Sequence, residues 1–192
     1  MKILSIDTET TGLDPTNCSV LEFGAVIFDP SPVIQGGDPA LRRWQTFECI
    51  IKHQRVQGEP YALGLNAEIL NEIAGEKETY RPIWDVTTFI TNFRGFLLDN
   101  QPEDEKFTIT GKNYDAFDRR FLDRVPGWRQ RILPLCERRT LDLGSLCFDP
   151  ADGKVVGLKE CLAKLGIIED VSHRALDDAL QVATGVSRFF AE

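Results

Sequence analysis

The sequence predicts one mixed α/β domain, and the order of its segments is the reason. Three strand-like segments come first, at 3–7, 19–28 and 44–51, and they are rich in β-branched and aromatic residues. They are joined without room for crossover helices, so we expect an antiparallel meander. Helical periodicity then alternates with short strands from residue 62 onward, which is typical of a mixed sheet covered by helices.

The remaining elements follow from periodicity and from helix start and stop signals. Pro82 suits a helix start, and Gly166 suits a helix end. A turn-rich connector at 29–40 separates the second and third strands. The other expected elements are helices at 62–73 and 82–98, a strand at 107–110, a helical segment at 116–125, a strand at 140–143, and helices at 158–165 and 174–190.

Composition is that of an ordinary globular protein. The chain has 192 residues, 42% of them hydrophobic and 27% charged, so we expect a single domain over 1–192. No apolar run approaches the length of a membrane span, and Asp7 interrupts any signal-peptide pattern, so we expect a cytoplasmic protein without a membrane partner. The five cysteines contain no C-x-x-C pair, which favours free thiols over a zinc site or a disulfide framework.

The charge distribution limits the ways in which the protein could bind nucleic acid. A net charge of −8 argues against a protein that coats nucleic acid by long-range attraction, but it is compatible with an enzyme that grips a few nucleotides. The stretch from Arg119 to Arg139 holds seven arginines against one aspartate and one glutamate. It is either a solvated helix face and loop or a rim that follows phosphates.

Two carboxylates, Asp7 and Glu9, stand at the end of the first apolar run. Residues two apart on a strand point to the same face, so both side chains can converge on one point. Two like charges about 4 Å apart repel by roughly 4 kcal/mol at an effective dielectric constant near 20. The spacing therefore predicts a compensating divalent cation.

Two further acidic segments lie where a predicted element meets the surface. Asp118 opens the helical segment around 118–122, and His173 precedes a helix start that carries Asp177 and Asp178. Taken singly, an aspartate at a helix start is usually a cap or dipole partner, and a lone histidine is usually structural. On a continuous helix, spacing from His173 would favour Asp177, and Asp115 is a rival for Asp118.

The order and residue patterns of these three segments resemble the motifs of the DEDDh, or DnaQ-like, 3′-to-5′ exonucleases. The resemblance spans almost the whole chain, from Ile3 to about Phe190. It implies a ribonuclease H-like fold, with a mixed five-stranded sheet whose first three strands are antiparallel and which is flanked by helices. It also implies that His173 lies just before the last helix, which favours Asp178 over Asp177. The implied metal ligands are Asp7, Glu9, Asp118 and Asp178, and all five residues, His173 included, are implied to be catalytic.

The implied reaction is hydrolysis of single-stranded DNA or RNA from the 3′ end, with release of nucleoside 5′-monophosphates. Two Mg²⁺ or Mn²⁺ ions about 4 Å apart can generate the nucleophile and stabilise the charge on the phosphate and leaving oxygen. Such hard cations prefer oxygen ligands, which explains four carboxylates. His173, with an ordinary pKa near 6.5, suits acceptance of the water proton.

The resemblance also indicates substrate contacts. Thr10, Thr11, Gly12 and Leu13 would hold the terminal nucleotide, and Leu65 and Asn66 lie in a segment similar to one that packs on the next nucleotide. An ordinary core leucine is an equal interpretation of Leu65. The expected partners are single-stranded 3′ ends and, as a further option, a polymerase or another replication or repair protein. An oligoribonuclease-like enzyme for short RNA is the alternative within the family.

The motifs of other protein classes match fewer residues of this chain. A phosphoaspartyl phosphotransferase would use Asp7 as its nucleophile, but it needs an aspartate where Glu9 stands. A P-loop is disfavoured because Gly111 and Lys112 lack the preceding glycine that this motif requires. A non-catalytic nucleic-acid-binding module would keep the fold without the five site residues, all of which are present here.

Overall fold

The computed structural model describes residues 2–30, 44–101, 105–168 and 172–191. The predicted connector at 29–40 lies outside these residues from position 31 onward. In the described part of the chain, no helix has the length and apolar character needed to cross a membrane. All five cysteines are free thiols.

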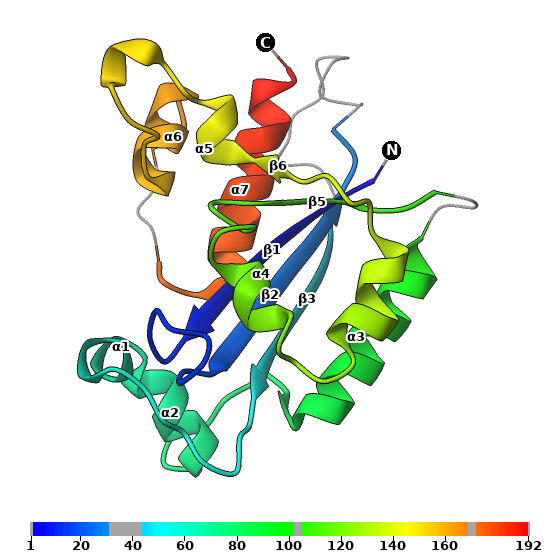
Figure 1. Ribbon diagram of the computed structural model, residues 1–192, viewed down its shortest axis with the longest axis vertical. Coiled ribbons are helices and arrows are strands. Elements are labelled where there is room, and N and C mark those ends of the chain that lie inside the picture. Colours follow the sequence, from blue (N-terminus) through cyan, green and yellow to red (C-terminus); the bar gives the residue numbers. More distant parts are fainter. Residues whose placement is uncertain (1, 31–43, 102–104, 169–171, 192) are drawn as a thin grey trace.

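A six-stranded mixed sheet forms the centre of the molecule, in the order β4-β3-β2-β1-β5-β6 (Figure 1). Its strands are β1 (Ile3–Thr10), β2 (Val20–Phe28), β3 (Gln45–Ile51), β4 (Ile83–Trp84), β5 (Thr108–Gly111) and β6 (Leu141–Asp142). The first three strands pair antiparallel, whereas β5 lies parallel to β1 and β6 lies parallel to β5. The predicted meander within a mixed, ribonuclease H-like sheet is thus confirmed.

Helices cover both faces of this sheet. The α-helices are α1 (Pro60–Leu65), α2 (Ala67–Ala74), α3 (Val86–Asn100), α4 (Asp118–Leu122), α5 (Leu143–Leu146), α6 (Leu158–Lys164) and α7 (Ala175–Phe189). The chain also forms a π-helix, η3 (Trp128–Ile132), and two 3₁₀-helices, η4 (Leu133–Leu135) and η5 (Pro150–Asp152). Helix α7 packs with α5 and α6 on the face that carries Ile3 and Val26, and α3 packs on the opposite face.

The sixth strand corrects two predictions, the strand count and the start of the long helix. Ile83 and Trp84 pair parallel to the outer edge of β3, through the Pro82 and Trp84 carbonyl oxygens. The helix begins only at Val86, because the Asp85 carboxylate accepts the Thr88 N–H at 2.8 Å and caps it. Strand pairing with β3 therefore determines the conformation of Ile83 and Trp84, although the helical periodicity of the predicted helix at 82–98 includes Ile83.

Three other predicted boundaries also differ. The helix expected at 62–73 is divided into α1 and α2 at Asn66, and the segment at 116–125 is helical only over Asp118–Leu122. Strand β1 continues past Asp7 to Thr10, because β2 pairs with it along its whole length. The two first-motif acids therefore lie within the strand, where the sheet fixes their backbone.

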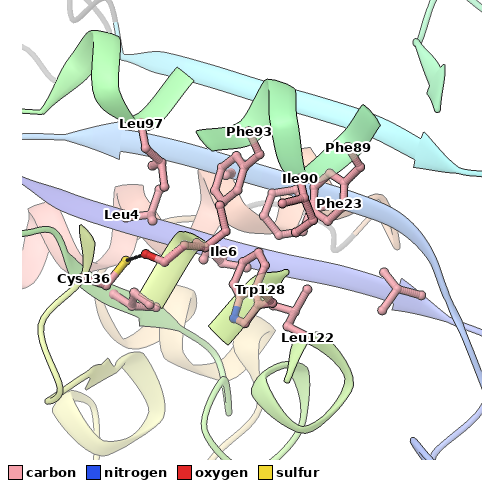
Figure 2. Close-up of a cluster of buried hydrophobic side chains, with 14 of the residues drawn as sticks. Leu4, Ile6, Phe23, Phe89, Ile90, Phe93, Leu97, Leu122, Trp128 and Cys136 are labelled. Atoms are coloured by element: carbon pink, nitrogen blue, oxygen red, sulfur yellow. Dashed lines mark hydrogen bonds between the residues drawn. The ribbon is translucent and has the colours of Figure 1, made fainter. Parts of the chain in front are cut away.

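An aromatic cluster between the sheet and α3 fixes the position of β1 (Figure 2). The ring of Phe23 lies 4.9 Å from that of Phe89 and 4.7 Å from that of Phe93, measured between centroids. Trp128 stacks on Phe93 at 5.8 Å. Leu4 and Ile6 of β1 belong to the same buried cluster, so close packing on this face holds the strand that carries the acids on its other face.

Candidate active site

Asp7 and Glu9 project from β1 on the face that α7 covers. Ser5 identifies this face, because its hydroxyl donates to the Ala179 carbonyl oxygen of α7 at 2.8 Å. Side chains two residues apart share a face, so Asp7 and Glu9 point toward the start of α7. The sheet thus aims both carboxylates at the third predicted motif.

The start of α7 rests directly on β2 at Gly24. Gly24 is the cross-strand partner of Asp7, and a Cβ added there would lie 2.3 Å from the Ala175 carbonyl carbon. Only glycine permits this approach. It brings Asp178, which is 7% exposed on the first turn of α7, to the acids of β1.

Asp118 reaches the same centre from the start of α4. It is 3% exposed, and its Oδ1 accepts a 2.6 Å hydrogen bond from the Thr8 hydroxyl. Thr8 lies between Asp7 and Glu9 on β1. This bond therefore ties the second motif directly to the first.

His173 lies in the segment before α7, and its φ angle is +54°. This left-handed conformation is unusual for a residue other than glycine. One ligand atom each of Glu9, His173 and Asp178 lies within 4.8 Å of the others, so His173 and Asp178 share the centre with β1. The predicted placement of His173 outside the helix agrees with the structure.

The carboxylates at this centre strongly resist simultaneous ionisation. Burial raises the pKa of Asp7 well above its usual range, and the charges of Asp118, Asp178 and Glu9 raise it further. Burial, with the charges of Asp178 and Glu22, raises the pKa of Glu9 to about 7. Burial also raises the pKa of Asp118 to about 7 and that of Asp178 to about 6. Such values are expected where several carboxylates crowd together without a cation.

The donor set fits divalent metal ions. The Asp178 Oδ1 atom is buried and has no hydrogen-bond partner among the described residues. A buried acceptor without a partner is costly, and a hard cation would satisfy it. Asp7, Glu9, Asp118 and Asp178 together offer the oxygen ligands that Mg²⁺ or Mn²⁺ prefers.

The predicted clamp, from Thr10 to Leu13, is held in shape by the segment before α1. Thr11 donates its hydroxyl to the Gln57 carbonyl oxygen at 2.6 Å, and the Glu59 carboxylate accepts the Leu13 N–H at 3.0 Å. The Thr10 hydroxyl is likewise bonded to the Gly12 carbonyl oxygen at 2.8 Å. These bonds shape the loop, and they leave the exposed Leu13 side chain as its most accessible contact.

Leu65 and Asn66 have different surroundings. Asn66 is buried, and its side chain donates to the Thr10 carbonyl oxygen at 3.1 Å. It therefore helps to hold the backbone of the clamp in place. Leu65 is 48% exposed, which excludes its interpretation as an ordinary core leucine. Leu13, in the clamp, is 70% exposed. Tyr61, one turn before Leu65 on α1, is 83% exposed. Figure 1 shows α1 beside the turn that follows β1.

The two rival acids face elsewhere. Asp115 is exposed and bonds to Arg119 at 2.8 Å and to the Thr140 hydroxyl. Asp177 is exposed, in contrast to its buried neighbour Asp178. The arginine-rich stretch is partly paired within the protein, for example Arg129 with an Asp123 oxygen at 2.8 Å. Its role as a phosphate rim stays a prediction.

Two curated relatives are DNA polymerases. DNA polymerase III PolC-type proteins of Thermotoga maritima and Thermotoga petrophila are 32% and 29% identical to the chain over 187 residues. These alignments take in 96% of this chain but 11% of each relative, so the chain spans about a tenth of their length. No protein-family model matches the chain.

Solved structures give the fold. The nuclease domain of 3′hExo, described as a DEDDh family member bound to rAMP, has a TM-score of 0.69 at 17% identity, covering 97% of this chain and 90% of that one. The chain thus has the fold of a DEDDh exonuclease domain. Escherichia coli Exonuclease I in complex with a dT13 oligonucleotide has a TM-score of 0.64 at 15% identity, covering 97% of this chain and 40% of that one. The fold that the DEDDh resemblance implies is thus confirmed.

Two residues that support this candidate site were not identified from the sequence. Thr8 holds Asp118, and Gly24 admits the start of α7. A glycine inside a strand pattern often marks a close backbone approach, so Gly24 had a sequence signal. Thr8 had none, because nothing local shows that its hydroxyl meets a residue 110 positions away.

Protons should stabilise the metal-free protein. Glu9 and Asp118 have pKa values of about 7 in the folded state, above the ordinary carboxyl range. The folded state therefore binds protons that the unfolded chain releases, and the stability present at low pH is lost as the pH rises through about 7. We expect calorimetry in EDTA to give a Tm several degrees higher at pH 6 than at pH 8.

Divalent cations should counteract this pH dependence of Tm, because they bind to the ionised carboxylates in place of the protons. Added Mg²⁺ or Mn²⁺ is expected to raise Tm more at pH 8 than at pH 6. Asp7→Asn removes one charge and should flatten the pH dependence in EDTA. A metal-free Tm that increases from pH 6 to pH 8 would contradict these assignments.

Proposed function

We propose that this domain is a metal-dependent 3′-to-5′ exonuclease that releases nucleoside 5′-monophosphates from single-stranded DNA or RNA. One observation carries the proposal: four carboxylates from β1, α4 and α7 converge on one centre and hold raised pKa values there. Two bound Mg²⁺ or Mn²⁺ ions would stabilise charge on the scissile phosphate and help to generate hydroxide near neutral pH. Asp7, Glu9, Asp118 and Asp178 would hold them.

The other residues of the chain act around that centre. His173, exposed beside Glu9 and Asp178, accepts the proton of the attacking water at an imidazole nitrogen. Leu13 and Leu65 offer exposed apolar contacts to the bases at the 3′ end, and Tyr61 extends this surface. Thr10, Thr11, Gly12 and Asn66 hold the clamp in shape.

Similar proteins support this choice of substrate. Exonuclease I was solved with a dT13 oligonucleotide, and the 3′hExo nuclease domain was solved with rAMP. The PolC-type polymerases make a DNA 3′ end the first substrate to test, and a polymerase is the proposed protein partner. We also propose that 1–192 form one exonuclease domain. The cytoplasmic location stays a prediction.

The reaction is tested by the direction of shortening. We expect 5′-labelled single-stranded DNA or RNA to give a ladder that shortens from the 3′ end only with Mg²⁺ or Mn²⁺, and thin-layer chromatography to identify nucleoside 5′-monophosphates. Matched DNA, RNA and dinucleotide substrates compare the general exonuclease with the oligoribonuclease-like alternative.

Four outcomes would overturn the proposal. Shortening from the 5′ end would exclude the assigned polarity, and activity that survives EDTA would exclude the metal. Binding without cleavage in Mn²⁺ would favour the non-catalytic module. A trapped aspartyl fluoride adduct at Asp7 would favour a phosphotransferase.

A further inference from the structure

His173 needs an external support to keep its position. Its backbone has a φ of +54°, and its side chain is exposed. A residue in this sparsely populated region persists when its surroundings fix it. Within the described ranges, no hydrogen bond of the imidazole to a neighbouring side chain supplies that support. The backbone on each side can supply that support: on one side the Ser172 backbone bonds to the Asp178 carboxylate, and on the other side lies Arg174.

Arg174, the next residue and the N-cap of α7, forms two ion pairs, of which only the one with Glu68 is also a hydrogen bond. One guanidinium nitrogen lies 3.7 Å from a Glu22 oxygen on β2, and the other bonds to Glu68 on α2. The first anchor belongs to the sheet, and the second belongs to a helix that is far away in sequence. Arg174 thus connects the third motif to two separate elements.

Glu22 is a rigid anchor because it is buried and paired. It is 1% exposed, and its other oxygen lies 2.6 Å from Arg81, which also pairs with Glu72 at 2.5 Å. Glu22 is the cross-strand partner of Glu9. The anchor of Arg174 therefore lies beside the first-motif acid that meets His173.

Helix α2 forms the other side of this network. Glu68 and Glu72 are one turn apart on α2, so they share a face. Glu72 binds Arg81, and Glu68 binds both Arg174 and Lys77. Lys77 pairs with the other oxygen of the same Glu68 carboxylate and does not itself contact the third motif, so it is a control for loss of a positive charge beside Glu68.

We propose that Arg174 is a positioning residue that holds His173 at the catalytic centre by joining Glu22 of β2 to Glu68 of α2. The role rests on the proposed function, because His173 matters only if it acts in catalysis. It makes α2 part of the apparatus that orients the third motif. Arg174 itself touches neither substrate nor metal in this role.

Kinetics of charge-neutral variants test this role. We expect Arg174→Gln and Glu68→Gln each to lower kcat by about 10- to 100-fold with little change in KM, because small misplacements of a catalytic group have effects of this size. The double variant should be no slower than the slower single variant, since each single variant already removes the shared contact between Arg174 and Glu68. Lys77→Gln should retain wild-type kcat, and Arg174→Lys should recover part of it.

A second measurement does not depend on activity. The chain has two histidines, His53 and His173, so their ring signals are easily assigned by NMR in the metal-free protein. In Arg174→Gln and Glu68→Gln, the His173 signal should move toward its position in an unfolded peptide, whereas the His53 signal should stay in place. His53 is held separately, by a 2.6 Å contact to the Val20 carbonyl oxygen.

The outcomes separate this proposal from the proposed function. If the wild-type protein cleaves no substrate, the exonuclease proposal fails, and the His173 signal still decides the position of that residue. If kcat and the His173 signal are unchanged in both variants, Arg174 does not position His173. A loss in Lys77→Gln equal to that in Glu68→Gln would also overturn the proposal. Should Arg174→Gln fail to fold, the exposed Glu68 still provides the test.

Discussion

We expect Asp178→Asn to reduce kcat by about 10³-fold or more, equivalent to roughly 4 kcal/mol of transition-state stabilisation. Asp178 is buried on the first turn of α7, and its Oδ1 has no protein partner within the described chain. Asparagine keeps the shape but removes the charge that a metal ion requires. Single-turnover rates in saturating Mn²⁺ provide the measurement.

Asp177→Asn is the matched control for this prediction. Asp177 has the same charge and lies on the same first turn of α7, but it is exposed. We expect it to retain kcat within about threefold, because a helix-dipole contact at the surface has a small effect. Mn²⁺ titration should show weaker binding for Asp178→Asn alone. A large loss in Asp177→Asn with little loss in Asp178→Asn would reverse the assignment of the third motif.

The largest expected effect on stability comes from Arg81. Arg81→Met should lower the free energy of unfolding by about 3–5 kcal/mol, because removal of one partner leaves buried charges uncompensated. Those charges belong to Glu22 and Glu72, which are 1% and 5% exposed. Chemical denaturation at pH 8 measures the change, since both carboxylates would be ionised there in an unfolded chain.

Two further variants separate lost packing from stranded charge. Arg55→Met removes an arginine that is exposed in the segment after β3, and it should change stability by less than about 0.5 kcal/mol. The combined Glu22→Gln, Arg81→Met and Glu72→Gln variant should recover part of the loss, because no buried charge remains. If it is less stable than Arg81→Met alone, packing of these side chains is the larger contribution.

Much of the fold could be predicted because its signals are local. The apolar and β-branched segments of β1, β2 and β3 determine their conformation, and short connections determine their antiparallel order. The start of α3 was predicted wrongly because Ile83 and Trp84 have no local preference strong enough to oppose pairing with β3. Element type was therefore more predictable than element boundaries.

Some residues of the candidate site could likewise be predicted from the sequence, whereas others could not. Spacing on a continuous helix favoured Asp177, whereas the resemblance to the family favoured Asp178. Burial in the tertiary structure distinguishes the two, because only Asp178 lies inside the protein near β1. Leu65 likewise had two equal interpretations until its exposure was known.

By itself, the sequence determined which side chains could bind metal and which strand carries the first two, because ligand type and the two-residue period are properties of the chain. Only the tertiary structure decided how the other groups reach that strand. Gly24 admits the start of α7, Thr8 holds Asp118, and Glu22 and Glu68 anchor Arg174. These contacts join residues far apart in sequence, and their strength depends on burial and close approach, which exist only in the folded molecule.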